Sequence, residues 1–279
     1  MAAHRNENVA TTNRQYAVAL SRALAGALIF CLPLLMTMEM WWLGFYFEPW
    51  RLMQFTIANI AILYGLSRVA GFEESHNWVD DVLDAFAAYF VASLTAALIL
   101  WMIGAIRPQM TPGEVVGMVA VQAVPASFGA MIGAKLMGEG EAIEQSEHWR
   151  KTYSGQLFLF LAGALFLSFT VAPTEEMILV SFQMNPWQSM AMMLASVAML
   201  HAILYVVEFH GQKRRFSNTH GEAFFRQTLP GYAIAVGASA YMMWSFGRLD
   251  GLDIGMAVMA VVVLAFPASI GAGIARIVV

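Results

Sequence analysis

The chain has 279 residues, of which 59% are hydrophobic and only 12% are charged, and its formal net charge is −4. A soluble domain carries about 25% charged residues, so this composition, with a mean hydropathy of +0.62, excludes a single large soluble core. The apolar residues form runs of about 20 residues or more, the length that crosses a hydrocarbon core of roughly 30 Å. The sequence therefore predicts an all-α membrane protein.

The polar N-terminal segment, residues 1–15, has no short apolar stretch followed by a small-residue cleavage site, so we expect no cleaved signal peptide. Eight helical spans are expected after it, because a helix satisfies its own backbone polar groups in lipid. They are 16–45, 49–72, 81–106, 112–137, 154–182, 186–209, 223–247 and 252–278.

A polar linker at 138–153 separates two four-helix halves, 16–137 and 154–279. Of the 15 Lys and Arg residues, all but three fall on the side that holds both termini. This distribution predicts cytoplasmic termini. The three on the opposite side are Arg51, Arg107 and Arg248.

An internal repeat relates the two halves. Shifting the sequence by 137 positions aligns 24–51 with 161–188 without a gap and gives eleven identities in twenty-eight positions. Glu39 aligns with Glu176, and Pro-Ala-Ser-x-Gly-Ala occurs at both 125–130 and 267–272. Because each half has an even number of spans, both enter the membrane in the same direction. We therefore expect a pseudo-twofold axis along the membrane normal.

Glu39 and Glu176 are the first candidates for a functional site. A carboxylate near the centre of a membrane helix costs about 2.5–3.5 kcal/mol, so it usually faces a cavity, a partner or a pathway. In a helix continuous to Phe45, Glu39 lies roughly 9 Å below the outer end. The pseudo-twofold axis predicts that the two acids face each other at an outer mouth and bind cations, above all divalent ones. Glu175 points about 100° away from Glu176 and is an accessory ligand.

Less specific interpretations of these segments stay open. The acids can extend to the headgroups or pair with Arg51. Pro33 and Pro173 predict a broken helix whose freed carbonyls bind a cation, although an ordinary kink is the simpler alternative. Thr37 and Thr174 lie roughly 200° round the helix from the acids, so their hydroxyls are expected to bond back to the backbone.

Two further clusters have mainly structural interpretations. The small residues of the Pro-Ala-Ser-x-Gly-Ala motif predict close helix packing, with a carbonyl-lined permeation path as the alternative. Polar residues near the cytoplasmic helix ends are expected to be solvated caps, since helix N-termini favour acids; an ion or proton exit is the alternative. They are Glu73, Glu74, His76, Asp80, Asp81, Asp84, His201, Glu208, His210, His220 and Glu222.

The chain has no nucleophile–base pair, catalytic metal motif or phosphate-binding glycine loop, so we expect neither an enzyme nor a nucleic-acid-binding protein. The segments 37–42 (Thr-Met-Glu-Met-Trp-Trp) and 172–176 (Ala-Pro-Thr-Glu-Glu) resemble bacterial inner-membrane proteins with two four-helix halves, a domain of unknown function. The resemblance implies a fold and no activity.

Together these observations predict a cation channel or transporter in the bacterial inner membrane, with Glu39, Glu176 and Glu175 as ligands of Ca²⁺ or another divalent cation. We expect no resident cofactor besides that ion. The expected partners are the lipid bilayer and cations, and association into a homo-oligomer is left open. The alternatives are a non-conducting membrane sensor or assembly subunit, and a proton-coupled carrier of a small solute.

Overall fold

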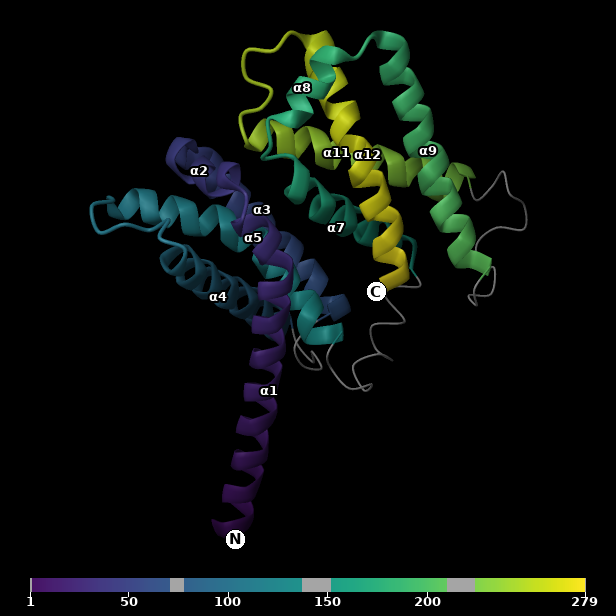
Figure 1. Ribbon diagram of the computed structural model, residues 1–279. Helices are drawn as coiled ribbons and strands as arrows, with labels where there is room; N and C mark the ends of the chain where they lie inside the picture. The colour runs from purple at the N-terminus through teal and green to yellow at the C-terminus, as the bar shows by residue number, and fades with distance from the viewer. Residues whose placement is uncertain (1, 71–77, 137–151, 210–223, 279) are drawn as a thin grey trace. The chain divides into compact units, whose positions relative to one another are not determined.

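The computed structural model describes residues 2–70, 78–136, 152–209 and 224–278, and these ranges contain helices and no β-strand (Figure 1). The chain divides into two compact units, unit 1 (Met1–Trp149) and unit 2 (Arg150–Val279). The helices of unit 1 are α1 (Ala2–Leu35), α2 (Met38–Tyr46), α3 (Pro49–Ala70), α4 (Trp78–Met102) and α5 (Pro112–Leu136). Those of unit 2 are α7 (Tyr153–Val171), α8 (Glu176–Gln183), α9 (Pro186–Phe209), the π-helix η2 (Phe224–Thr228), α11 (Leu229–Ser245) and α12 (Ile254–Val278).

The last helix of each unit is its packing centre. In unit 1, α5 contacts α1, α2, α3 and α4. In unit 2, α12 contacts α7, α8, α9 and α11. The other helix pairs correspond as well, because α4 packs on α1 and α3 in one unit and α11 packs on α7 and α9 in the other. Each unit thus has the same set of helix neighbours in the same chain order.

Helix ends follow local sequence signals. α5 begins with a capping box in which the N–H of Thr111 donates to Glu114 Oε2 over 2.7 Å. α9 begins with reciprocal bonds between Asn185 and Gln188, at 2.8 and 2.9 Å. After α4 and α11 the chain turns at Gly104 (φ 73°) and Gly247 (φ 69°), in the left-handed conformation that commonly ends a helix.

Six helices are long and apolar enough to cross a membrane, judged by length and composition over the described residues. They are Ala17–Leu35, Trp78–Met102, Pro112–Ile132, Tyr153–Val171, Pro186–Leu204 and Ile254–Arg276. The expected second and seventh spans do not meet both conditions. α3 includes Arg51, Gln54, Asn59 and Arg68, and α11 has 17 residues. Length and composition therefore support six of the eight expected spans.

The first and fifth expected spans are each interrupted. α1 ends at Leu35 and α2 begins at Met38, while α7 ends at Val171 and α8 begins at Glu176. The membrane-crossing part of α1 and the whole of α7 have 19 residues each, about 28 Å of helix. That length already matches the hydrocarbon core. Glu39 and Phe45 both lie on α2, so the expected spacing of about 9 Å along the helix between them holds, but the helix that carries them is the short α2 and not the membrane-crossing α1.

Candidate functional site

The helix break in unit 1 is held by a threonine. Thr37 has an extended backbone and precedes α2 as its N-cap residue. Its N–H donates to the carbonyl oxygen of Leu34 over 3.1 Å, and its hydroxyl donates to the same oxygen over 2.7 Å. One carbonyl at the end of α1 therefore receives two donors from one residue, which satisfies a group that the helix end leaves unpaired.

The break in unit 2 has the same bonding at the aligned residue. The N–H and the hydroxyl of Thr174 donate to the carbonyl oxygen of Val171 over 3.1 and 2.9 Å. The predicted back-bonding of both threonine hydroxyls is confirmed. The broken helix predicted at Pro173 is observed, since α7 stops two residues before it, whereas Pro33 lies inside α1, which continues to Leu35.

Glu39 lies in the first turn of α2 and is half-buried, beside the fully buried Met40. Arg51, which could have been its partner, lies 3.2 Å from Glu48 through its Nε atom. Glu48 also accepts a 2.6 Å hydrogen bond from Trp50 Nε1. Among the described side chains, no ion pair between Arg51 and Glu39 is observed.

In unit 2, the two adjacent acids differ. Glu176 is exposed in the first turn of α8. Glu175 lies 3.6 Å from Arg248 Nη1, with side-chain exposures of 83% for the acid and 19% for the base. The Arg248 guanidinium also donates through Nη2 to the carbonyl oxygen of Pro173. Arg248, in the loop between α11 and α12, therefore contacts two residues of the break between α7 and α8. It also compensates part of the Glu175 charge.

Within the described residues, no group of three or more His, Cys, Asp or Glu side chains is close enough to hold a metal ion. Glu39 belongs to unit 1, whereas Glu175 and Glu176 belong to unit 2. That Glu39 and Glu176 face each other stays a prediction.

The small-residue motifs pack as expected. A β-carbon at Gly129 of α5 would lie 2.6 Å from the carbonyl oxygen of Gly26 in α1, closer than side chains allow. In unit 2 the same conflict arises between Gly271 of α12 and Gly163 of α7. The close helix contact predicted for the Pro-Ala-Ser-x-Gly-Ala motif is confirmed within each unit. Val121 and Val263, whose carbonyls could have lined a path, are themselves buried.

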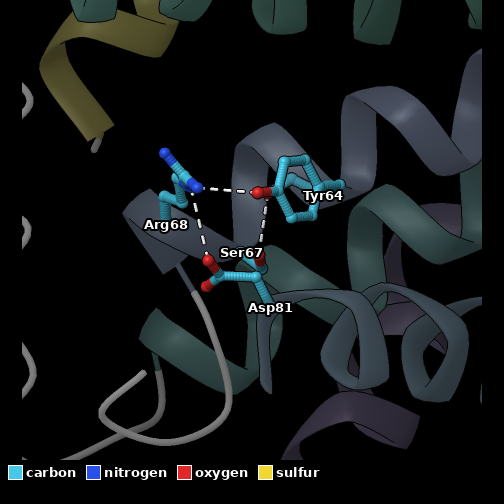
Figure 2. A network of polar contacts seen from close by, with 4 residues as sticks. All are labelled: Tyr64, Ser67, Arg68 and Asp81. Carbon is cyan, nitrogen blue, oxygen red and sulfur yellow. Dashed lines mark hydrogen bonds and ion pairs between the residues drawn. The ribbon is translucent and has the colours of Figure 1, made fainter. Parts of the chain in front are cut away.

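A polar network joins α3 and α4 at the end expected to be cytoplasmic (Figure 2). Arg68 Nε donates to Asp81 Oδ2 over 3.3 Å, and Arg68 Nη2 donates to the hydroxyl of Tyr64 over 2.6 Å. The Asp81 side chain is only 6% exposed, so its prediction as a solvated cap is wrong. Sequence reasoning missed this contact, because Arg68 and Asp81 lie on different helices.

The π-helix η2 organises a second network, in unit 2. His201 Nδ1 and Thr228 Oγ1 are 2.8 Å apart, and Arg276 donates to Gln227 Oε1 over 2.5 Å. The Glu208 side chain lies outside the described residues. Also outside are Glu73, Glu74, His76, His210, His220 and Glu222.

Sequence reasoning missed a set of buried amides in unit 1. Asn59 Nδ2 donates to the hydroxyl of Ser127 over 3.1 Å, and both residues are buried. Gln122 is fully buried in α5, and its side-chain nitrogen and oxygen have no partner among the described residues. An unpaired buried amide costs free energy, so its burial is a feature to explain. The signal was available, since Gln122 and Asn59 are uncharged polar residues inside apolar runs.

The helical fold, the six apolar helices and the buried polar side chains between them define an integral membrane protein. The chain belongs to the family described as "Putative integral membrane protein (DUF2391)", which it matches over residues 19–279. This membership confirms the resemblance carried by segments 37–42 and 172–176 to a domain of unknown function. No curated protein and no solved structure matches the chain.

Proposed function

We propose that this membrane protein conducts or transports a cation, and that Glu39 and Glu176 bind the ion at the outer end of its path. The observation that carries the proposal is the helix break found in each unit. In both, a helix of membrane-crossing length stops, a threonine satisfies its last turn, and a glutamate lies in the first turn of the short helix that follows. Discontinuous helices are the usual sites of ion binding in transporters.

The proposal includes two four-helix repeats and both termini in the cytoplasm. The matching helix neighbours within each unit support the repeats. The positions of α3 and α11 support eight spans, because each packs on its unit's central helix as the six apolar helices do. The π-helix η2, five residues long, directly precedes the 17 residues of α11 and extends it toward membrane-crossing length.

Divalent ions such as Ca²⁺ suit this site better than soft metals, because carboxylate and carbonyl oxygens are hard ligands. Glu175 is an accessory ligand, since its pair with Arg248 is open to water and such pairs contribute little. A cation that binds Glu176 can draw Glu175 away from Arg248.

Thermal unfolding in detergent tests this proposal. Ligand at 100 times its Kd stabilises a protein by about 2.7 kcal/mol, so Ca²⁺ or Mn²⁺ should raise the Tm by several degrees. The rise should be absent from the double variant Glu39→Gln/Glu176→Gln. Glu48→Gln is the matched control, because Glu48 follows α2 and already pairs with Arg51. Flux into liposomes then separates a channel from a carrier.

A second candidate function is a non-conducting sensor or assembly subunit. The contact of Arg248 with Glu175 and Pro173 favours this second function. In that contact, an acid and the helix break stabilise the position of the loop between α11 and α12 and do not bind an ion. In that case the Tm is indifferent to metal ions. Flux is absent, and Arg248→Gln is the more damaging variant.

A further inference from the structure

A pocket of about 630 Å³ lies in unit 1 between α2, the loop that follows α4, and the start of α5. α2 contributes Trp41, Trp42 and Phe45, and the loop after α4 contributes residues 103–105, 107, 109 and 110. The volume falls in the range of small-molecule sites, roughly 300–1,000 Å³, which are mostly apolar with a few polar groups. The pocket is large enough for a ligand with an apolar body.

Two charged residues, Glu114 and Arg107, line the pocket, and they differ in whether the protein already uses their side chains. Glu114 is used by the protein, because its Oε2 accepts from both the N–H and the hydroxyl of Thr111, over 2.7 and 2.9 Å. Arg107 has no carboxylate partner among the described residues. Its backbone N–H donates to the sulfur of Met110 over 3.1 Å, and its carbonyl oxygen accepts from the N–H of Met110 over 3.1 Å, so both of these bonds involve its backbone. An anion attached to an apolar group is the complementary ligand.

In unit 2, the loop after α11 carries an arginine that is already paired with an acid of the same unit. At an offset of 143, Gly247 aligns with Gly104, and both have left-handed backbones. The residue after Gly247 is Arg248, which pairs with Glu175 at 3.6 Å. At an offset of 137, Glu175 aligns with Met38, a lining residue of the unit 1 pocket. Arg248 itself aligns with Ala105, so the loop arginine of unit 1, Arg107, stands two positions later, and unit 1 has a methionine where unit 2 has the acid.

We propose that this pocket binds an anionic phospholipid, with the phosphate on Arg107 and the adjoining acyl carbons on Trp41, Trp42 and Phe45. A guanidinium holds phosphate with two parallel hydrogen bonds. Tryptophan and tyrosine gather at the headgroup level of membranes, where one end of a side chain is apolar and the other is wet. Since the family is one of integral membrane proteins, phospholipid is the amphiphilic anion that surrounds the chain.

The ion site at the helix breaks and this lipid site are separate. Neither Glu39 nor Glu176 lines the pocket. The comparison with Arg248 rests on the proposed repeat, whereas the unpaired Arg107 and the aromatic wall do not. A failure of cation binding therefore leaves the lipid site unaffected.

Native mass spectrometry of the full chain in detergent tests the proposal. The probes are dioctanoyl phosphatidylglycerol, dioctanoyl phosphatidylcholine and inorganic phosphate. Phosphatidylglycerol should bind most tightly, and Arg107→Gln should weaken it about tenfold or more, as expected for loss of hydrogen bonds to a charged group. Arg51→Gln is the control, because it removes an equal charge from the same expected side, outside the pocket.

A second pair of variants guards against a folding defect. Met38 is 54% exposed, so it tolerates substitution. Met38→Glu supplies the acid that unit 2 has and should weaken phosphatidylglycerol as Arg107→Gln does, whereas Met38→Gln should change its Kd less than about twofold. The proposal is overturned by equal affinity for the two lipids, by equal effects of Arg107→Gln and Arg51→Gln, or by phosphate competing as tightly as the lipid.

Discussion

Gly163 of α7 and Gly271 of α12 approach so closely that a β-carbon on either one would collide with the carbonyl oxygen of the other. In unit 1, a β-carbon on Gly129 would lie 2.6 Å from the carbonyl oxygen of Gly26. All four residues belong to the two motifs that recur between the halves, Leu-Ala-Gly-Ala-Leu and Pro-Ala-Ser-x-Gly-Ala. The two repeated motifs are therefore packing partners of each other within each unit.

Gly163→Ala should lower the stability of the protein. Alanine adds a helix-propensity gain of about 1 kcal/mol, but the new methyl group would overlap backbone, and overpacking costs about 1–3 kcal/mol. The Tm in detergent is expected to fall by several degrees. Gly237→Ala is the control in the same unit, because a β-carbon there meets nothing within 4 Å, and it should leave the Tm unchanged or raise it. A rise in Tm for both variants would show that α7 and α12 pack less closely at Gly163 than described.

Thr174→Val should destabilise the helix break in unit 2. The hydroxyl of Thr174 donates to the last carbonyl of α7, and its loss should cost about 1 kcal/mol. Thr170→Val serves as the comparison. The Thr170 hydroxyl bonds back to Leu167 inside the regular helix, where the helical hydrogen bonds of the neighbouring turns hold the backbone without it. Unfolding followed by circular dichroism should show a larger loss of stability for Thr174→Val than for Thr170→Val. Equal losses of stability would show that the hydroxyl at the break contributes no more than one inside a regular helix.

The Arg68–Asp81 pair should show an intermediate coupling energy. Exposed pairs contribute about 0–1 kcal/mol, while breaking a buried pair costs about 3–5 kcal/mol. Here the arginine side chain is 46% exposed and the acid is 6% exposed. A double-mutant cycle of Arg68→Gln and Asp81→Asn, read from thermal unfolding, should give about 1 kcal/mol. A coupling of zero would mean that Asp81 is held by other groups.

Much of the helix pattern was predictable because lipid restricts the choice. Apolar runs of spanning length must be helical, and Pro-Trp at positions 49–50 and 186–187 marks where α3 and α9 begin. The threonine back-bonds were predictable from local geometry, since a hydroxyl reaches a carbonyl three or four residues earlier. The packing of small residues followed from their size.

Interactions between distant residues were not predictable in this way. The burial of Asp81 depends on Arg68, which comes from a different helix. The fastening of the break at Pro173 depends on Arg248, 75 residues away. Local sequence patterns carry no information on such pairs. The span from 16 to 45 was expected to break or kink at Pro33, yet α1 continues through Pro33 and stops at Leu35.

Calcium titration of purified protein by calorimetry tests most directly the proposal that Glu39 and Glu176 bind one cation. A site that needs both carboxylates loses most of its affinity with either substitution, so Glu39→Gln and Glu176→Gln should each weaken binding at least about tenfold. The double variant should then be little worse than either one, because contacting groups are strongly non-additive. Effects that simply add, or single variants that bind Ca²⁺ as tightly as the native protein, would contradict a cation held between the two acids.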